Sequence, residues 1–206
     1  GPNNQPNKDV EEYGTFYVKS KYYAYTSLSK CRLNDRIYTL FPTLVFGGDK
    51  NHPFSHISSG LVPNKHYLNF LRYFYLEGSF HFIHSKDIAK VVDFLMKREV
   101  DQKDFVLGHQ VLSVKEAISA VCSAFDIPIY FQLKLPVMFL YKLARIMRVE
   151  VDPWSDYCIR NPHMNYKTVN PKSFGMVSSY AKLDELVHDT LKEQTLDDTS
   201  LELNPG

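Results

Sequence analysis

The stretch "RIYTLFPTLVFGG", residues 36–48, decides the fold class. Apolar and β-branched residues follow one another almost without a break from Arg36 to Phe46, as in a strand that is buried on both faces. Strands of that kind lie in parallel sheets covered by helices, so the stretch indicates an α/β protein. Two glycines end the run at a turn. Pro42 cannot donate a hydrogen bond to a neighbouring strand, and we therefore expect it at the strand's end or at a bulge.

The segments on either side of this strand alternate between helical and extended patterns. Helices are indicated by apolar residues at steps of three and four, strands by short apolar runs, and helix starts by polar capping residues. In the first half of the chain we expect a helix over 15–31 capped by Thr15, the strand 36–46, a loop over 49–60 and an aromatic helix over 64–78 ended by Gly78. A strand over 79–84 and a helix capped by Asp87 follow. After them we expect a strand over 104–108, a helix from Ser113 with a capping box to Glu116, and a last helix over 180–192. This alternation favours an α/β chain with parallel strands.

The composition is that of an ordinary globular protein. Of the 206 residues 44% are apolar and 23% are charged, and the chain is long enough for one domain with a sizeable core. The net charge of +1 comes without long single-sign blocks, which argues against a nucleic-acid partner. Three cysteines without paired spacing favour reduced thiols, and with no signal peptide visible we expect a cytoplasmic location.

The longest apolar tract, "LPVMFLYKLARIM" at residues 135–147, is too short to span a bilayer and is interrupted by basic residues. On a helix Lys142, Arg145 and Arg148 lie within roughly 120° of one another. A buried helix with one solvated stripe is the favoured interpretation, and a membrane partner is not expected. A peripheral membrane contact through the three basic residues is the alternative.

The sequence "YVKSK" puts Tyr17 and Lys21 four residues apart at the start of the first expected helix. Positions four apart share one face of a helix, so the hydroxyl and the ammonium can meet. An ammonium beside a phenol stabilises the phenolate, which lets the tyrosine exchange a proton with a substrate. The spacing alone decides nothing, because about one such pair is expected by chance and Tyr130 with Lys134 forms a second. The second pair lies in an extended segment beside prolines, and we interpret it as accidental.

Four motifs in order give the chain a resemblance to a known family. "YVKSK" is followed by "RIYTLFPTLVFGG", then by "FHFIHSKDIAKVVDFL" and "DFVLGHQVLSVKEAISAV". Together they resemble the extended short-chain dehydrogenase/reductases, the NAD-dependent epimerase/dehydratase group, from about residue 13 to 125 and more weakly to about 190. The matching residues are Tyr17, Ser20 and Lys21; Phe41, Pro42, Val45, Phe46 and Gly47; His84, Asp87 and Ala89; and Gly108, Ser113 and Glu116.

The resemblance implies a fold, an activity and site residues. The fold would be α/β, with a partial Rossmann-like parallel sheet and a small, mainly helical substrate lobe. The activity would be that of an NAD(P)-dependent oxidoreductase, epimerase or dehydratase acting on a nucleotide-sugar or a similar hydroxyl or ketone. Tyr17 would be the catalytic acid/base. Lys21 would assist it and hold the nicotinamide ribose, while Pro42 and Val45 would line the nicotinamide of NAD or NADP.

The same resemblance divides the chain into four parts. Residues 1–12 form a polar N-terminal segment, and 13–125 form the C-terminal part of the Rossmann-like domain with a substrate-loop insertion near 49–78. Residues 126–192 form the substrate lobe and closing helix. The polar tail 193–206 is expected to fray.

Two parts of the family pattern are missing from the chain. None of the nine glycines falls into the glycine-rich strand-to-helix turn that binds a dinucleotide pyrophosphate, and no serine or threonine before Tyr17 is placed to orient a substrate oxygen. The chain would then be a fragment, one half of a split enzyme, or a binding or assembly module without catalysis. A fragment or half would expose a sheet edge and an apolar helix face, which predicts the missing N-terminal half or a homo-oligomer as its partner.

Four further residues are weaker candidates for substrate contacts. His52 and His56 lie in the loop after the Pro42 strand, which in the family approaches the substrate, although polar loop residues are the simpler interpretation. Arg72 and Arg160 could meet a sugar or phosphate, with surface ion pairs as the alternative.

A metal site is not expected. His81, His84 and Asp87 have suggestive spacing, but the two histidines are an odd number of residues apart and point to opposite faces of a strand. Asp87 is in addition the expected helix cap. Cys158 has no base beside it in the sequence, and we do not expect it to act as a nucleophile.

Overall fold

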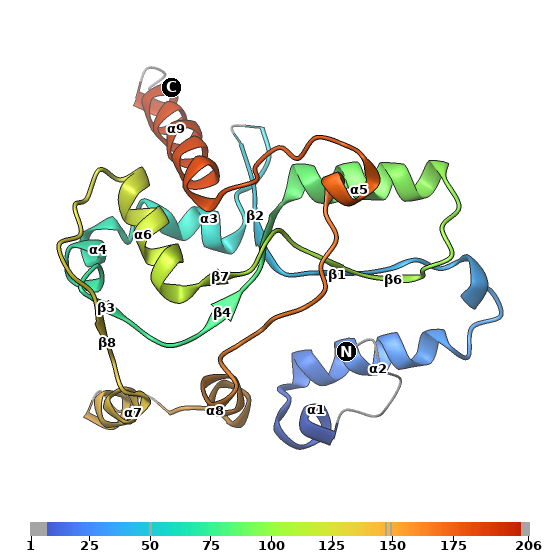
Figure 1. The fold of residues 1–206 in the computed structure, drawn as a ribbon, viewed down its shortest axis with the longest axis horizontal. Helices are drawn as coiled ribbons and strands as arrows, with labels where there is room; N and C mark the ends of the chain where they lie inside the picture. The colour runs from blue at the N-terminus through green and yellow to red at the C-terminus, as the bar shows by residue number, and fades with distance from the viewer. Residues whose placement is uncertain (1–7, 50, 147, 149, 203–206) are drawn as a thin grey trace.

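The computed structural model describes residues 8–49, 51–146, 148 and 150–202. Its strands run through the middle of the molecule, with helix α5 (Ser85–Lys97) on one side and helices α1 (Lys8–Tyr13) and α2 (Phe16–Leu28) on the other (Figure 1). In this part of the chain the strands form four pairs, of which three are parallel. The α/β class expected from the sequence is therefore confirmed.

The stretch 36–48 forms two strands instead of one. The strands and their parallel partners are β1 (Thr39–Pro42) with β6 (Asp104–Leu107), and β2 (Leu44–Phe46) with β5 (Phe82–His84). Between β1 and β2, the amide and the hydroxyl of Thr43 both donate to the Leu107 carbonyl, at 3.0 and 2.8 Å. The chain thus changes its partner from β6 to β5 at Thr43. Pro42 is the last residue of β1, as the missing amide donor requires.

Gly108 allows three chain segments to meet at this change of partner. A β-carbon on Gly108 would lie 2.9 Å from the His81 side chain and 3.0 Å from the side chains of Thr43 and Thr168. These distances are shorter than a normal carbon contact, so a larger residue would push the segments apart. The junction ties the β1–β6 pair to the β2–β5 pair.

Two apolar clusters form the core. Helix α5 buries Val91 and Leu95 against Ile83 of β5 and the side chains of β6. Helices α6 (Val114–Ala124) and α9 (Leu183–Glu202) pack together over Phe46 and Phe82. Burial of a large apolar side chain stabilises a fold by about 1.5–3 kcal/mol, so these clusters hold the helices onto the strands.

The helix caps agree with the sequence in two cases and differ in one. The Thr15 hydroxyl accepts from the Val18 amide at 3.3 Å at the start of α2, and the Ser113–Glu116 capping box starts α6. The cap of α5 is wrongly indicated by the sequence. The His84 side chain accepts from the Lys86 amide at 3.1 Å, while Asp87 is buried completely and accepts from His109 and Ser179, which are distant in the sequence.

The segment 49–78 departs furthest from the sequence expectation. The expected loop contains a short helix, α3 (His56–Leu61), and the aromatic helix, α4 (Lys65–Leu71), ends well before Gly78. From Phe74 the chain is a strand, β3 (Phe74–Tyr75), which pairs in parallel with β8 (Leu133–Lys134). Pairing with a distant strand therefore outweighs the helical periodicity of the local sequence.

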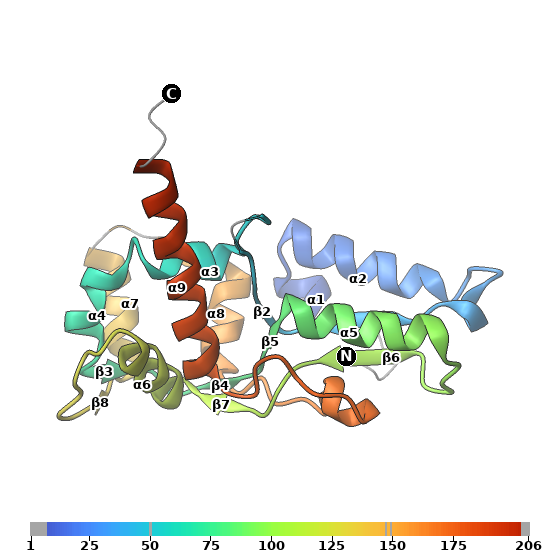
Figure 2. The same ribbon diagram turned by 90° about the horizontal axis from the view of Figure 1, so that it is seen from above.

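A lobe of helices completes the fold. The remaining elements are the antiparallel pair β4 (Ser79–Phe80) and β7 (Leu112–Ser113), the helices α7 (Val137–Ile146) and α8 (Pro153–Arg160), and the 3₁₀ turns η1 (Asn34–Arg36) and η2 (Pro171–Phe174). Figure 2 shows α4 and α7 at one end of the molecule and α2 toward the other. Of the helices in the described residues, none combines the length and the apolar character that crossing a membrane requires.

The two ends of the chain are described only in part. Helix α9 continues to Glu202, past residue 192 and into the tail that was expected to fray. At the other end, α1 begins at Lys8 within the polar N-terminal segment, and Tyr13 stacks on Tyr157 of α8 with ring centroids 5.6 Å apart. Residues 1–7 and 203–206 lie outside the described residues.

Candidate functional site

Helix α2 presents Tyr17 and Lys21 side by side. The Lys21 Nζ atom lies 5.5 Å from the centre of the Tyr17 ring, a distance at which an ammonium and an aromatic ring attract each other. The spacing of four residues therefore puts both side chains on one face, as expected. Tyr17 is 68% exposed, and the Ser20 hydroxyl between them donates to the Tyr17 carbonyl at 2.8 Å.

Tyr25 anchors α2 to the strands. Its hydroxyl donates to the Asp104 carboxylate at 2.7 Å, and its ring meets Phe41 edge-on with centroids 5.1 Å apart. The hydrogen bond to Asp104 and burial raise the pKa of Tyr25 to about 12. Residues 17, 21 and 25 follow one another at steps of four, so the anchor holds the face that carries Tyr17 and Lys21.

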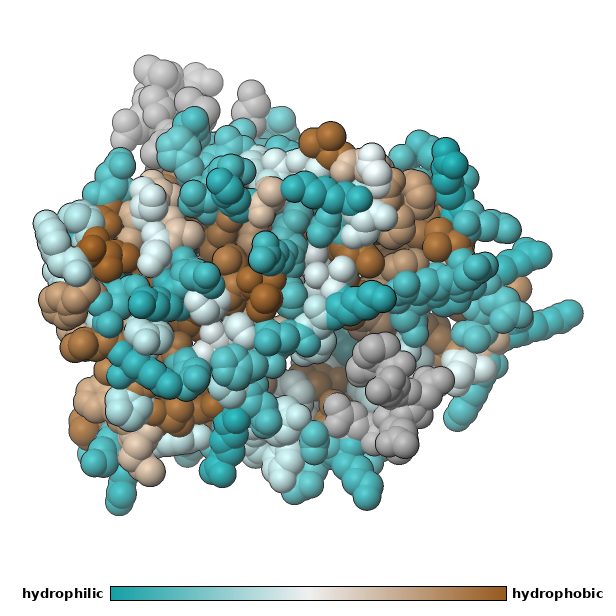
Figure 3. Space-filling view, in the orientation of Figure 1, coloured by the Kyte–Doolittle hydropathy of each residue, from teal (hydrophilic) through white to brown (hydrophobic). Residues whose placement is uncertain are grey.

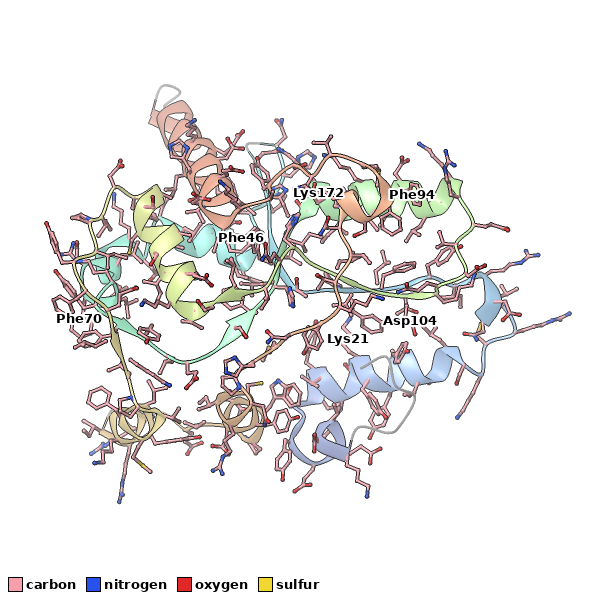
Figure 4. The ribbon with its side chains drawn as sticks, viewed as in Figure 1. Lys21, Phe46, Phe70, Phe94, Asp104 and Lys172 are labelled. Carbon is pink, nitrogen blue, oxygen red and sulfur yellow. The ribbon has the colours of Figure 1, made fainter. Side chains whose placement is uncertain are left out.

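The direction of α2 places Tyr17 at the carboxyl end of β1. Tyr25 contacts Asp104, the first residue of β6, and α2 runs opposite to β1 (Figure 1). Eight residues of helix span about 12 Å, so Tyr17 lies that much farther toward the strand ends. Figure 4 shows Lys21 between α2 and the strands. Ligands of open α/β sheets bind at the carboxyl ends of the strands, which makes this edge the candidate site.

The two expected nicotinamide neighbours differ in exposure. Pro42 is exposed at the carboxyl end of β1 and is free to contact a ligand bound at that edge. Val45 is half-buried, and its side chain packs against the core cluster that contains Ile83 and Val91. Pro42 thus extends the candidate site, whereas much of the Val45 surface is already in contact with the core.

The four expected substrate residues lie in the loop before α3 and at its start, at the end of α4 and at the end of α8. His52 in the loop after β2 bonds to Asp49 at 2.9 Å, and His56 is the exposed first residue of α3. A backbone hydrogen bond and the His52 ring lower the pKa of Asp49. Arg72 follows α4 and donates to the Pro128 carbonyl at 3.0 Å.

Arg160, the fourth of these residues, forms an ion pair within its own helix. Its Nε atom lies 2.8 Å from the Asp156 carboxylate one turn earlier on α8, and its side chain is 71% exposed. The contacts found among the described residues do not join any of the four to another. Their role as substrate contacts stays a prediction.

A buried polar group that the sequence does not reveal centres on Asp87. Its carboxylate accepts from His109 Nε2 at 3.0 Å and from the Ser179 amide at 2.6 Å, and Lys90 lies 3.7 Å away. Burial alone would raise the pKa of Asp87, but the hydrogen bonds from His109 and Ser179 hold it below its usual value. Asp87 thereby joins α5, the loop after β6 and the segment before α9. In the sequence Asp87 was noticed only as the expected helix cap, and nothing there indicated its bonds to His109 and Ser179.

His81 extends this group toward the helical lobe. Since a carbonyl only accepts, His81 Nδ1 carries a proton and donates to the His109 carbonyl at 2.7 Å. Its Nε2 atom then accepts from the Tyr166 amide at 3.0 Å. His81 and Asp87 both have partners other than a metal, and His84 is buried as the cap of α5, which lowers its pKa. The three side chains therefore act as structural connectors.

Cys158 is half-buried on α8. Burial raises the pKa of its thiol, which disfavours the reactive thiolate. The side chain shows no hydrogen bond to a base among the described contacts. The structure thus offers no activation for the nucleophile that the sequence already argued against.

Two cavities of about 470 Å³ each lie away from Tyr17 and Lys21. One is bordered by the start of α6 and residues 181–184, with mixed polar and apolar walls. The other lies among α4, α6 and α7, and its walls are almost entirely apolar. Phe70 of α4 belongs to the second cavity and is labelled in Figure 4.

Comparison with known proteins identifies the fold. No protein-family model matches the chain, and no curated protein sequence matches it significantly. The crystal structure of gox2253 superposes with a TM-score of 0.61 at 17% identity, over 94% of this chain and 59% of that chain. A nucleoside-diphosphate-sugar epimerase from Pseudomonas aeruginosa superposes with a TM-score of 0.55 at 13% identity, over 95% and 57%. The UDP-glucose 4-epimerase from Bifidobacterium longum, solved with NAD+ and UDP, gives 0.50 at 19%, over 88% and 55%.

These neighbours confirm an α/β fold of the epimerase type that is only partly present. The chain covers 55% to 59% of the length of the three neighbouring structures. A partial Rossmann-like fold is therefore shown, in agreement with the sequence expectation. At 13% to 19% identity the likeness concerns the fold.

Proposed function

We propose that the chain is the C-terminal part of an NAD(P)-dependent oxidoreductase, epimerase or dehydratase acting on a nucleotide-sugar or a similar hydroxyl or ketone. The observation that carries the proposal is the exposed Tyr17–Lys21 pair on α2, at the carboxyl end of β1. The fold adds support, because its neighbours include a UDP-glucose 4-epimerase solved with NAD+ and UDP.

In this proposal Tyr17 exchanges a proton with a substrate oxygen. The Lys21 ammonium, 5.5 Å from the centre of the Tyr17 ring, would stabilise negative charge that develops on the phenol during the transfer. When bound, the nicotinamide cofactor supplies the hydride chemistry. Lys21 would also donate to the nicotinamide ribose, and the exposed Pro42 would contact the nicotinamide ring beside it.

The residues present fit only one end of such a cofactor. Tyr17, Lys21 and Pro42 are all exposed around the carboxyl end of β1, which leaves space for a nicotinamide ribose. The pyrophosphate needs a glycine-rich turn, and the glycines of the sequence do not have that spacing. Tight binding of NAD or NADP therefore requires residues from elsewhere.

We further propose that the missing half covers α2. None of the 13 residues of this helix is buried, and Phe16 is 91% and Tyr23 51% exposed. Aromatic side chains on an open helix face mark an interaction surface. A glycine-rich half, in the same polypeptide or in a second chain, would supply both the cover and the pyrophosphate site. A second copy of the present chain is the alternative occupant.

A non-catalytic binding or assembly module is the second candidate function. It is favoured by the openness of α2, because an exposed Tyr17–Lys21 pair is also what an ordinary solvated helix face presents. In that case the fold is retained and α2 still binds a partner through its exposed face, but Tyr17 and Lys21 are only a solvent-exposed pair. The two candidates differ in their response to cofactor and to substitution of Tyr17.

The deciding experiment uses the complete protein, with any glycine-rich segment encoded upstream or in a partner gene. Calorimetric titration with NAD and NADP should show binding, and Tyr17→Phe should lower turnover by about 10²- to 10⁴-fold while cofactor affinity is unchanged. Tyr130→Phe, in the second Tyr-x-x-x-Lys pair, is the matched control and should leave turnover unchanged because Tyr130 is 78% exposed and far from α2 in the sequence. Absence of nicotinamide binding in the complete protein would refute the enzyme proposal and leave the non-catalytic candidate.

A further inference from the structure

Helix α7 exposes large apolar and basic side chains on the same face. None of its described side chains is fully buried, so the interpretation as a buried helix is wrong. Met138, Phe139 and Ile146 are 66%, 50% and 78% exposed. At 100° per residue these three fall within the same roughly 120° sector as Lys142 and Arg145. The exposed face therefore alternates large apolar side chains with cations.

The positive charge of this face is not balanced locally. Residues 137–148 contain three basic side chains and no acidic one, and the first acid that follows is Glu150. The ion pairs found among the described residues leave out Lys142, Arg145 and Arg148. Asp156 on α8 already accepts from the Tyr141 hydroxyl and pairs with Arg160. The cations of α7 are thus available to an external anionic partner.

The apolar part of the face continues onto α4. Phe139 borders the apolar cavity together with Phe70 and Leu71, which are themselves 67% and 48% exposed. Figure 3 shows hydrophobic side chains gathered at the end of the molecule where α4 and α7 lie. We call this region the α4–α7 surface: Phe70, Leu71, Met138, Phe139 and Ile146, with the cations Lys142 and Arg145. Apolar patches of this kind on a folded protein mark contact sites.

We propose that the α4–α7 surface docks on an anionic phospholipid bilayer, with α7 lying in the plane of the interface. The boundary between headgroups and acyl chains accepts both components of this face at once. Phenylalanine, methionine and isoleucine side chains enter the acyl boundary, while lysine and arginine extend to the phosphates. The cavity beneath Phe139 gives that ring room to change position as it enters the lipid.

Other occupants fit this surface less well. A second copy in a two-fold dimer would bring two faces together that carry basic and no acidic residues over 137–148, which is repulsive. The proposed glycine-rich half has to meet α2, and α2 lies toward the other end of the molecule (Figure 2). That half therefore has a surface of its own to cover, on α2.

Vesicle co-sedimentation of the full chain tests the proposal. The probes are vesicles of pure phosphatidylcholine and vesicles in which about one third is replaced by phosphatidylglycerol. Binding is expected only to the anionic vesicles, with a strong decrease as salt is raised. Each basic residue near such a surface contributes about fivefold to the partition coefficient, so Lys142→Glu with Arg145→Glu should lower it by about 25-fold or more.

Two sets of variants make the result specific. Met138→Ser with Ile146→Ser removes exposed apolar side chains without a change of charge and should also weaken binding to anionic vesicles. Lys97→Glu with Arg98→Glu makes the same charge change at the exposed end of α5 and should bind like the wild type. All substituted residues are exposed, so circular dichroism should show unchanged folding.

Three results would overturn the proposal. The first is no binding of the wild type to anionic vesicles. The second is an equal loss in the α5 control, which would mean that only net charge matters. The third is a wild-type dimer in sedimentation velocity that the α7 charge variant converts to a monomer, since the surface would then bind a second copy.

Discussion

Replacing Asp87 by asparagine tests the buried polar group that joins three segments of the fold. The carboxylate accepts from His109 and from the Ser179 amide while fully buried. An asparagine oxygen can serve one of these donors, and its NH₂ group then faces the other. Loss of one charge-assisted hydrogen bond costs about 1.5–3 kcal/mol, and a buried donor without a partner costs about 1–3 kcal/mol more.

The expected loss of unfolding free energy is therefore about 2.5–6 kcal/mol. For a chain of this size that corresponds to a decrease in Tm of roughly 10 °C. Urea unfolding and thermal melts followed by far-ultraviolet circular dichroism measure both quantities. Asp93→Asn is the matched control, because Asp93 lies on the same helix with its side chain 63% exposed and pairs only with Lys97 there. That control should change stability by less than about 0.5 kcal/mol.

The same variant should alter the pH dependence of stability. Because the pKa of Asp87 is lower in the folded protein than in the unfolded chain, its contribution is present above about pH 4 and is lost as the pH falls through the folded value. The gap between wild type and Asp87→Asn should thus narrow from about pH 5 toward about pH 3. A loss below about 1 kcal/mol at neutral pH, or a gap that does not change with pH, would refute the role assigned to the carboxylate.

Three other changes test single contacts. Tyr25→Phe should lower the free energy of unfolding by about 1–2 kcal/mol by removing the hydrogen bond to Asp104. Because folding raises the pKa of Tyr25, the difference in stability between wild type and variant should disappear between about pH 10 and about pH 12. A phenolate absorbance titration measures the pKa of the tyrosine that the variant lacks. Gly108→Ala should cost about 1–3 kcal/mol in urea unfolding because its β-carbon meets neighbours at 3.0 Å or less, whereas Gly60→Ala, with its nearest atom at 3.7 Å inside α3, should be neutral or slightly stabilising. Ser113→Ala should lose about 1 kcal/mol through the capping box of α6, and an unchanged Tm would contradict that role.

Features that depend on neighbouring residues in the chain could be predicted from the sequence. Thr15 and the Ser113–Glu116 box start their helices because a cap needs only residues within one turn. Tyr17 and Lys21 share a face because the helical repeat brings positions four apart together. The position of Pro42 at a strand end follows from its missing donor.

The predictions from the sequence were wrong where contacts with a distant segment decide the local structure. The aromatic repeat after Asn64 predicted one helix to Gly78, but pairing with residues 133–134 makes the later part a strand. Asp87 has the position and chemistry of a cap, yet His109 and Ser179 arrive from elsewhere and take its carboxylate. Apolar residues in 135–147 suggested burial, and only packing shows that α7 lies on the surface.

The sequence by itself determined the α/β class, the starts of α2 and α6 and the shared face of Tyr17 and Lys21, since these depend on periodicity and on groups a few residues apart. Only the tertiary structure decided which strands pair, where the strand at 36–46 changes partner, and which apolar side chains remain exposed. Those outcomes depend on contacts between residues far apart in the chain, where packing and burial outweigh local propensity. The contacts of Tyr25 with Asp104 and Phe41 hold α2 beside β1, and the direction of α2 against β1 brings Tyr17 to the strand ends.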